Sequence, residues 1–183
     1  LHAVGGKPML GHVLDTARAA GVAAFHIVHG HGAEQVRAAF AKAEGVNWAL
    51  PEKQLGTGHA VQQSAPNVPD DALILVLYGD VPLITVETLK SLTEAARDTL
   101  AIVTVELAQP KGYGRILRDT QRRVTGIVEE KDANDDQRRI TEVNTGLMAA
   151  PAKLLKPWLS QLKNQNANGE FYLTDVIGFA VRD

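Results

Sequence analysis

The sequence has no cysteine among its 183 residues, which excludes disulfide bonds, thiolate nucleophiles and zinc sites built on cysteine. Charge of one sign is not in excess either: 19 Lys and Arg residues stand against 21 Asp and Glu residues, and the formal net charge is −2. Nucleic-acid-binding proteins usually carry a basic face or stripe. The one basic cluster, "RILRDTQRR", is diluted by acids on both sides and is typical of a solvated surface. We therefore expect no nucleic-acid partner.

Long hydrophobic runs are also absent. No apolar segment approaches the roughly 20 residues that a membrane-spanning helix needs, and no secretory signal is visible. We expect no membrane partner and, because the lack of cysteine fits a reducing compartment, a cytoplasmic location. The apolar fraction of 45% and the charged fraction of 22% are ordinary for a globular protein, and the length suits one domain.

Strands and helices are predicted to alternate through the first 110 residues. Apolar runs predict strands at 23–30, 46–50, 72–78 and 100–107. The most apolar of these are continuous rather than alternating, as in strands that are buried on both faces. Helical spacing of apolar residues predicts helices at 8–21, 33–45, 58–66 and 85–98. This order is typical of βαβ units, so we expect an α/β fold with a mostly parallel sheet and helices on both faces.

The pattern changes after residue 110. Two shorter strands are predicted within 112–119 and 122–132, and a charged loop at 132–139. We interpret residues 111–140 as a small antiparallel insert. The chain then returns to the main sheet at 141–150, enters a helix at Pro151, and ends in a helix capped by Thr174 or Asp175.

Asp80 is the first candidate functional residue. It follows the strongest predicted strand in "LYGDVPLI", where Gly79 allows the backbone to turn and approach a ligand. Ligands of open α/β sheets bind beyond the carboxyl ends of the strands. A carboxylate there suits Mg²⁺, which takes one or two carboxylates plus phosphate oxygens. The alternative is that Asp80 only caps a turn, and the pattern leaves both open.

Three further motifs offer ligand contacts. The loop "QLGTGHA" places two glycines around a hydroxyl just before a helix, where backbone N–H groups can bind an anion or a base edge. "PKGYGRI" allows close backbone approach or a β-bulge. Glu129 could accept hydrogen bonds from sugar hydroxyls, and Asn144 offers a donor and an acceptor together. A flexible turn and ordinary solvated residues are the alternatives.

Metal-like spacing occurs only at His29 and His31, and no third ligand is evident, so we interpret "VHGHG" as a structural loop. No nucleophile elbow and no Ser/His/Asp arrangement is present in the pattern.

Taken together, the motifs resemble one family. "LHAVGGKPML", "KQLGTGHA", "LYGDVPLI", "GYGRI", "VTGIVEEKDA", "EVNTGLMAA" and "NGEFYLTDVI" occur in the order found in the uridyltransferase half of the bacterial bifunctional N-acetylglucosamine-1-phosphate uridyltransferase / glucosamine-1-phosphate N-acetyltransferases. The resemblance covers essentially the whole chain. "QLGTGHA", "GIVEEKDA" and "NGEFYLTD" are the motifs most specific to this family.

This resemblance implies a Rossmann-like nucleotidyltransferase domain that uses Mg²⁺ to make UDP-N-acetylglucosamine and pyrophosphate from UTP and N-acetylglucosamine-1-phosphate. The product would serve peptidoglycan and lipopolysaccharide synthesis, and the parent protein would also acetylate glucosamine-1-phosphate with acetyl-CoA, as a homotrimer. The resemblance implies that Gly56 and Thr57 contact the uracil. It implies that Tyr78, Gly79 and Asp80 line the nucleotide-sugar site, with Asp80 also a metal ligand. It implies that Gly114, Glu129 and Asn144 hold the sugar.

The chain also departs from the family pattern. The "LAAGxGTRM" loop on the first strand, the following "LPK" lysine, a second metal-ligand Asn and the acetyltransferase half have no counterpart in the sequence. A family Gln that reads uracil falls at Pro51, which has no side-chain amide. We therefore expect residues 1–183 to be a partial domain, inactive alone and active within its parent. The alternatives are a non-catalytic nucleotide-sugar binding module and a related sugar-phosphate nucleotidyltransferase.

Overall fold

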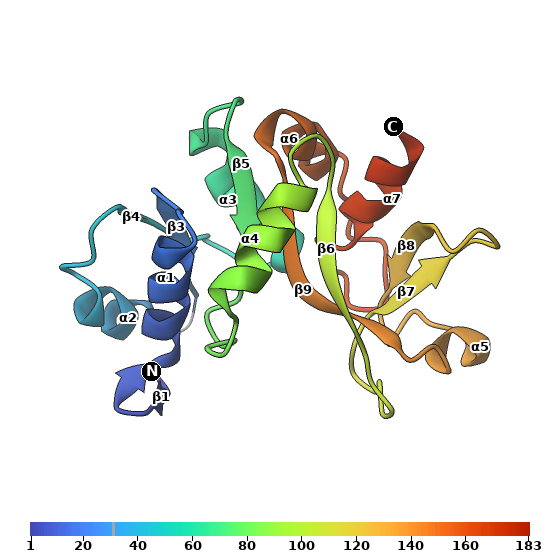
Figure 1. Cartoon of the computed structure of the whole chain (residues 1–183), viewed down its shortest axis with the longest axis horizontal. Helices are drawn as coiled ribbons and strands as arrows, with labels where there is room; N and C mark the ends of the chain where they lie inside the picture. The colour runs from blue at the N-terminus through green and yellow to red at the C-terminus, as the bar shows by residue number, and fades with distance from the viewer. Residues whose placement is uncertain (31) are drawn as a thin grey trace.

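The computed structural model describes residues 1–30 and 32–183, in which helices and strands alternate as expected (Figure 1). The first half comprises β1 (Ala3–Val4), β2 (Lys7–Pro8), α1 (Met9–Ala19), β3 (Phe25–Val28), α2 (Ala33–Ala39), β4 (Val46–Ala49), α3 (Thr57–Ser64), the 3₁₀ turn η1 (Ala65–Asn67) and β5 (Leu73–Val76). The second half comprises α4 (Val86–Ala95), β6 (Ala101–Glu106), β7 (Arg115–Arg118), β8 (Val124–Val128), α5 (Asp135–Arg138), β9 (Glu142–Pro151), α6 (Ala152–Ser160) and α7 (Asp175–Arg182).

The long strand β9 is the centre of a five-stranded sheet. It pairs with β5, β6 and β7, and β7 pairs in turn with β8. At Met148 both edges of β9 are occupied, by Val76 of β5 and Ile102 of β6. At Val143 they are occupied by Val105 of β6 and Arg115 of β7. Since β6 keeps one edge of β9 throughout, β5 and β7 share the other edge.

The α/β class with a sheet covered by helices is confirmed, but the expected strand directions need correction. The one hydrogen-bonded parallel pair in the described ranges is β3 with β4, which form a separate two-stranded sheet. β5 and β6 run in the same direction, but each pairs antiparallel to β9, which lies between them. The sequence at 141–150 indicated a return to the main sheet and carried no information on the direction of β9.

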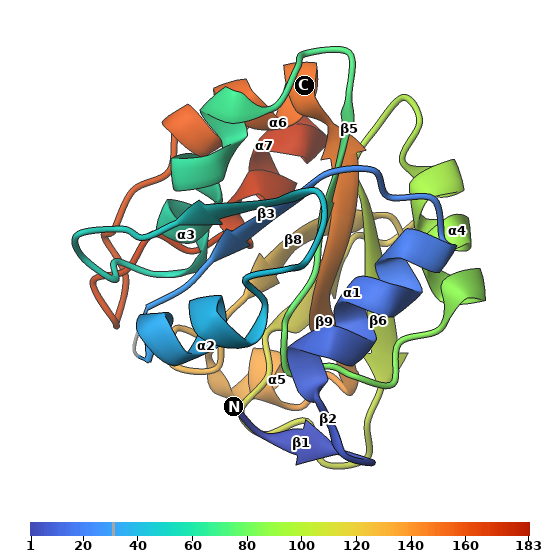
Figure 2. The ribbon, with the colours of Figure 1, turned by 90° about the vertical axis from the view of Figure 1, so that its left-hand side faces the viewer.

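Helices cover both faces of the sheet. Figure 2 shows α1 and α4 on one side of β5 and β9, and α3, α6 and α7 on the other. The core on the second side centres on Met148, Leu155, Trp158 and Val176, each no more than 4% exposed. Ala149 contributes to the opposite side with Leu92 of α4. Alternate residues of β9 therefore anchor the two helical layers to one strand.

Local sequence signals account for the starts of several helices. Pro8 stands at the N-cap of α1, and the Thr85 hydroxyl caps α4 by accepting the Thr88 N–H at 3.2 Å. The expected charged loop at 132–139 is wrong in part, because Asn134 and Gln137 form a capping box that starts the short helix α5. Thr174 precedes α7, but its hydroxyl makes no cap bond.

The strands β3 and β5 were expected to be buried and are only partly buried. Among the described residues, β3 pairs with one strand, β4, and β5 pairs with one strand, β9. The other edge of each strand faces a cavity, so neither strand is paired on both edges in the described part of the chain.

The loop before α3 is joined to the segment before α7 by backbone contacts. The Phe171 N–H donates to the Leu55 carbonyl at 2.8 Å, and the Gly58 N–H donates to the Phe171 carbonyl at 2.8 Å. A Cβ atom on Gly58 would lie 2.5 Å from Leu162 Cδ1 and 2.8 Å from the Phe171 oxygen. Two motifs that are far apart in sequence, "QLGTGHA" and "NGEFYLTD", thus form one tightly packed unit.

This packing makes Gly58→Ala destabilising, although alanine is the better helix former. We expect a loss of about 1–3 kcal/mol in the free energy of unfolding, because the new methyl group overlaps a backbone oxygen that cannot move without breaking its hydrogen bond. Gly178→Ala is the matched control: it is also helical, and a Cβ there meets nothing within 4 Å. This control should gain about 0.5–1 kcal/mol. Urea unfolding measures both; a gain for Gly58→Ala would contradict the close packing.

Candidate functional site

Strand register places three of the candidate residues side by side. Arg115 lies opposite Val143 of β9 and opposite Val128 of β8. In antiparallel pairs the neighbours of paired residues also face each other, so Gly114 lies between Asn144 and Glu129. The Asn144 N–H donates to the Gly114 carbonyl at 2.9 Å, which agrees with this register.

Position 114 requires glycine because a larger residue's Cβ atom would have no room. A Cβ atom at this position would lie 3.3 Å from both carboxylate oxygens of Glu129 and 2.9 Å from Ile127 Cγ2. The Glu129 carboxylate therefore lies directly over the glycine backbone. The Asn144 side-chain oxygen accepts the Gly146 N–H at 3.0 Å, which fixes the orientation of its amide. The site thus presents a carboxylate beside an oriented amide.

Tyr78 adds an aromatic wall to this group. Its ring lies against Gly146, where a Cβ atom would come within 2.4 Å of the ring. Burial raises the pKa of Tyr78 above its usual value, and the negative charges of Glu129 and Asp80 raise it further. Gly79 and Asp80 follow at the exposed rim. Tyr78 therefore stays a neutral phenol in an acidic environment.

Thr174 and Asp175 belong to the same place and were predicted only as caps of the last helix. The Thr174 hydroxyl, in a residue that is 7% exposed, donates to Glu129 Oε1 at 2.8 Å. Burial raises the pKa of Asp175, and Glu129 and Asp132 raise it further. The sequence signal for Thr174 was the motif "NGEFYLTD", but a threonine before a helix has the more common function of a cap.

The other two candidates, Gly56 and Thr57, lie at the start of α3. Gly56 has φ +107°, and a Cβ there would come within 2.8 Å of the Phe171 oxygen. The Thr57 hydroxyl accepts the Leu173 N–H at 3.2 Å. Leu173 is next in sequence to Thr174, so the loop "QLGTGHA" is linked to the Glu129 group through one backbone segment.

An ion pair between the buried Arg115 and the partly exposed Glu130 holds the "GYG" turn in place. Arg115 is 1% exposed and donates from Nη2 to Glu130 Oε2 at 2.7 Å, and it also binds the Tyr113 carbonyl. The same Glu130 oxygen accepts the Gly112 N–H at 3.1 Å. These bonds lower the pKa of Glu130, with the Arg115 contact as the main cause. The turn before Gly114 is therefore fixed by charge-assisted bonds.

The donor set limits how a metal could bind. Within residues 1–30 and 32–183, no group of three or more His, Asp or Glu side chains is placed to hold a metal ion. Asp80 is one exposed carboxylate, which fits a magnesium ion shared with substrate phosphates and not one enclosed by protein. His29 packs edge-on against Trp48 at 5.4 Å, and His31 lies outside the described residues.

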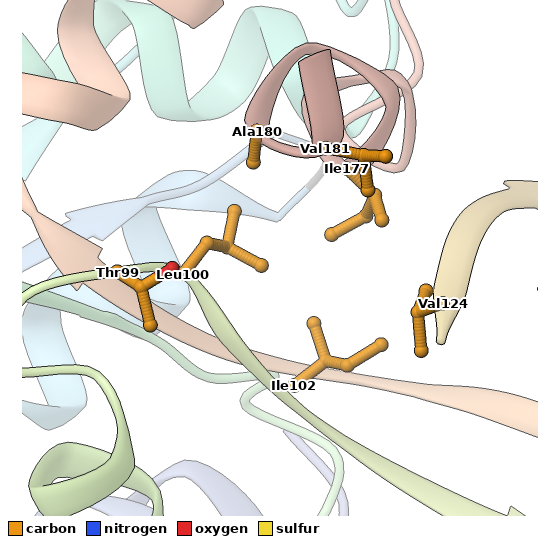
Figure 3. Close-up of a pocket in the computed structure, with 7 residues that line it drawn as sticks. All are labelled: Thr99, Leu100, Ile102, Val124, Ile177, Ala180 and Val181. Atoms are coloured by element: carbon orange, nitrogen blue, oxygen red, sulfur yellow. The ribbon is translucent and has the colours of Figure 1, made fainter. Parts of the chain in front are cut away.

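A small cavity elsewhere has a different character. It measures about 210 Å³ and lies between β6, β8 and α7 (Figure 3). Its lining is almost wholly apolar, consisting of Thr99, Leu100, Ile102, Val124, Ile177, Ala180 and Val181. None of the candidate residues lines this cavity.

In addition, no helix of the described structure has the length and apolar character to cross a membrane.

The crowding of acids around Glu129 predicts a pH-dependent cost in stability. We expect Asp175→Asn to raise the free energy of unfolding at pH 7, because the folded chain resists ionisation of Asp175 and the unfolded chain does not. The gain develops as the pH rises above about 3.9 and vanishes at lower pH, where Asp175 is protonated in both states. The preference of the α7 N-terminus for negative charge offsets part of it.

Chemical unfolding at pH 3 and pH 7 measures this difference. Asp98→Asn is the control, because Asp98 is exposed on the loop after α4. An equal gain for Asp175→Asn at both pH values would show that ionisation is not the cause.

A family profile and curated relatives both match this chain. The profile of the MobA-like NTP transferase domain family matches residues 1–159. "Bifunctional protein GlmU" of Alkalilimnicola ehrlichii is 57% identical over 183 residues, and the protein of the same name from Xanthomonas oryzae pv. oryzae is 55% identical. Both matches cover 100% of this chain but 39% and 40% of those proteins. The resemblance found in the motifs is thereby confirmed.

Solved structures share the fold at low sequence identity. A UDP-glucose pyrophosphorylase complexed with UDP-glucose has a TM-score of 0.76 at 17% identity, covering 97% of this chain and 76% of its own. A putative glucose-1-phosphate thymidylyltransferase from Bacillus anthracis has a TM-score of 0.77 at 17% identity, covering 100% of this chain and 73% of its own. The fold, the sequence profile and the curated relatives agree, and the chain belongs to the MobA-like NTP transferase domain family.

Proposed function

We propose that residues 1–183 are the uridyltransferase part of an enzyme that joins UTP to N-acetylglucosamine-1-phosphate, releasing pyrophosphate and forming UDP-N-acetylglucosamine. The identity of 57% with a "Bifunctional protein GlmU" over the whole chain supports this. Because the chain spans only about 40% of the length of those relatives, acetylation of glucosamine-1-phosphate with acetyl-CoA and a homotrimeric state are proposed for the longer protein. A cytoplasmic location also stays a prediction.

The observation that carries the proposal is the row of Glu129, Gly114 and Asn144 across three neighbouring strands. A carboxylate and an oriented amide next to a bare glycine backbone suit a sugar, whose hydroxyl groups both donate and accept hydrogen bonds. We assign the sugar to this row. The Tyr78 ring, held against Gly146, closes one side of the space.

The uridine half is assigned to the loop before α3. Gly56 and Thr57 stand at the start of that helix, where backbone N–H groups can bind a base edge. Pro51, where the resemblance implies a Gln that reads uracil, offers no side-chain amide. The packing of Gly56 and Gly58 against Phe171 supports this assignment, since it holds the loop rigid beside the segment that carries Thr174.

The reaction needs no protein nucleophile. An oxygen of the sugar phosphate attacks the α-phosphorus of UTP in line, the bond from that phosphorus to the bridging oxygen of the β-phosphate breaks, and pyrophosphate leaves with the electron pair. The residues hold the two substrates in this geometry, which alone lowers the barrier substantially. Glu129 and Thr174 orient the sugar, and the neutral Tyr78 excludes water from one side.

Magnesium is part of the proposal. Substrates with several phosphate charges must enter a site that contains Glu129, Asp175 and Asp80. When bound, Mg²⁺ neutralises phosphate charge and polarises the phosphoryl oxygens. Asp80 is the residue that would hold it, and its exposed position at the rim leaves room for substrate oxygens as the remaining ligands.

Two alternatives make different predictions. A non-catalytic nucleotide-sugar binding module would bind UDP-N-acetylglucosamine without turnover. A related nucleotidyltransferase would prefer another base or another sugar phosphate. Membership of a transferase family disfavours the first, and the motif "QLGTGHA" disfavours the second. A panel of nucleotides and sugar phosphates separates them.

Pyrophosphate release tests the proposal directly. The complete gene product that contains residues 1–183 should release pyrophosphate from UTP and N-acetylglucosamine-1-phosphate, and EDTA should block the release. Asp80→Asn should lower kcat by about two orders of magnitude or more, because the metal loses its protein ligand. Asp98→Asn, an exposed acid of the same charge, should retain full activity. Turnover of Asp80→Asn at the wild-type rate would remove Asp80 from the site.

Glu129→Gln tests the sugar assignment. We expect KM for N-acetylglucosamine-1-phosphate to rise about tenfold or more with a smaller effect on KM for UTP, because hydrogen bonds to a charged acceptor contribute about 1.5–3 kcal/mol. Glu87→Gln, on the exposed face of α4, is the control. If both Michaelis constants and kcat of Glu129→Gln match the wild type, the sugar does not bind at this row.

A further inference from the structure

The polar segment 166–170, between α6 and α7, folds into a compact turn around one side chain. The Asn166 side-chain oxygen accepts the N–H groups of Asn168 and Glu170, both at 3.2 Å. The Asn166 side-chain nitrogen donates to the Glu170 carbonyl at 2.6 Å, and the Asn166 carbonyl accepts the Gly169 N–H at 3.1 Å. The shape of this turn is therefore set by its own hydrogen bonds.

Two side chains of the loop that follows β8 attach this turn to the main sheet. Asp132 Oδ1 accepts the Ala167 N–H at 2.9 Å. Lys131 Nζ donates to Asn168 Oδ1 at 2.6 Å. All four residues are exposed, so packing contributes little to holding them together. The position of the turn relative to β8 therefore depends on these two hydrogen bonds.

The same loop carries Glu129, the carboxylate of the proposed sugar site. The Thr174 hydroxyl donates to Glu129 Oε1 at 2.8 Å. Both ends of the segment 166–174 therefore contact the short stretch 129–132, one end through Ala167 and the other through Thr174. A change at the first contact alters the span that the chain must cover to reach the second.

The middle of the segment also lies close to Asp132. Tyr172 is 9% exposed, and burial raises its pKa. The negative charge of Asp132 raises the pKa of Tyr172 further, which places the carboxylate near the phenol. Asp132 therefore acts on the segment at two positions before Thr174.

The opposite side of the segment is held by the loop before α3. The Phe171 N–H donates to the Leu55 carbonyl, and the Leu173 N–H donates to the Thr57 hydroxyl. Thr174 follows directly after these bonds and reaches across to Glu129. The distance between the Thr174 hydroxyl and Glu129 thus depends on anchors at both sides of the segment.

We infer that Asp132 is a positioning residue for the proposed sugar site: by accepting the Ala167 N–H, it holds the segment 166–174 where the Thr174 hydroxyl bonds to Glu129. That bond fixes the direction in which Glu129 presents its remaining acceptor positions to a sugar. Asp132 itself touches no substrate. The assignment of the sugar to Glu129 rests on the proposed function, whereas the positioning is a property of the folded chain alone.

Two substitutions in the complete gene product separate the hydrogen bond from the charge. Asp132→Ala removes both, whereas Asp132→Asn removes the charge and keeps an oxygen that can accept the Ala167 N–H. We expect Asp132→Ala to raise KM for N-acetylglucosamine-1-phosphate about threefold to tenfold, with kcat and KM for UTP changed by less than about twofold. Asp132→Asn should restore the wild-type KM. Asp98→Ala, at an exposed acid far from this loop in sequence, is the control.

A double-mutant cycle with Thr174→Val tests the route of the effect. If Asp132 acts through the Thr174 hydroxyl, Asp132→Ala adds no further increase in KM once that hydroxyl is gone. The inference would be overturned by an equal increase in both backgrounds, by an Asp132→Asn enzyme as impaired as Asp132→Ala, or by a wild-type KM for Asp132→Ala.

Amide exchange without substrate distinguishes failure of the inference from failure of the proposed function. Asp132→Ala should speed exchange of the Leu173 N–H about threefold or more, and Asp132→Asn should not. Absence of turnover by the wild-type enzyme would refute the proposed function and leave this measurement to decide the positioning. Unchanged exchange at Leu173 in Asp132→Ala would overturn the positioning.

Discussion

One edge of β9 has to serve two different strands, and the location of the candidate site follows from this constraint. β5 occupies the edge from Met148 onward, and β7 reaches it at Val143. Between them lies a short stretch with no strand along that edge. There the Asn144 side chain accepts the N–H of Gly146, which has φ +84°, and the Thr145 hydroxyl accepts the Leu147 N–H. Tyr78 approaches this gap from one strand and Gly114 from the other, so the proposed binding surface lies at an interruption in strand pairing.

Electrostatics give this surface its chemical character. Glu129, Asp175 and Asp80 are the acids of this surface. Burial raises the pKa of Tyr78 and of Asp175, and the charge of Glu129 raises both further. Arg115, the cation of the same motif, is already neutralised by Glu130. The folded chain therefore carries a charge imbalance that a bound cation can relieve. Proteins commonly accept such a cost in stability at functional sites.

Much of this arrangement could be predicted from the sequence, because it depends on local signals. Apolar runs, Pro8, Thr85 and Pro151 located the strands and helices, and the motifs located Asp80, Glu129 and Asn144. Strand direction could not be predicted: the buried run at 147–150 of β9 is apolar whether its neighbours are parallel or antiparallel. α5 was missed, since a capping box in a charged segment looks like a loop.

The function of individual side chains was harder still to predict. Thr174 has the residue type and position of a helix cap, and only the fold shows that its hydroxyl binds Glu129 instead. Gly58 looks like a flexible residue in a ligand loop. Glycine is required there because a Cβ atom would overlap the oxygen of Phe171, more than a hundred positions away in sequence. Long-range packing of this kind has no signature within a short window.

The two tryptophans of the chain fall on opposite sides of the division between the sheets. Trp48 lies in β4, half-buried and edge-on to His29, in the small two-stranded sheet. Trp158 lies in α6, 4% exposed in the core of the large sheet, and its indole N–H donates to Asp183 at 2.7 Å. Each side of the division therefore has its own tryptophan. Emission from single-tryptophan forms distinguishes a molecule that melts as one cooperative body from one in which the small sheet loosens first.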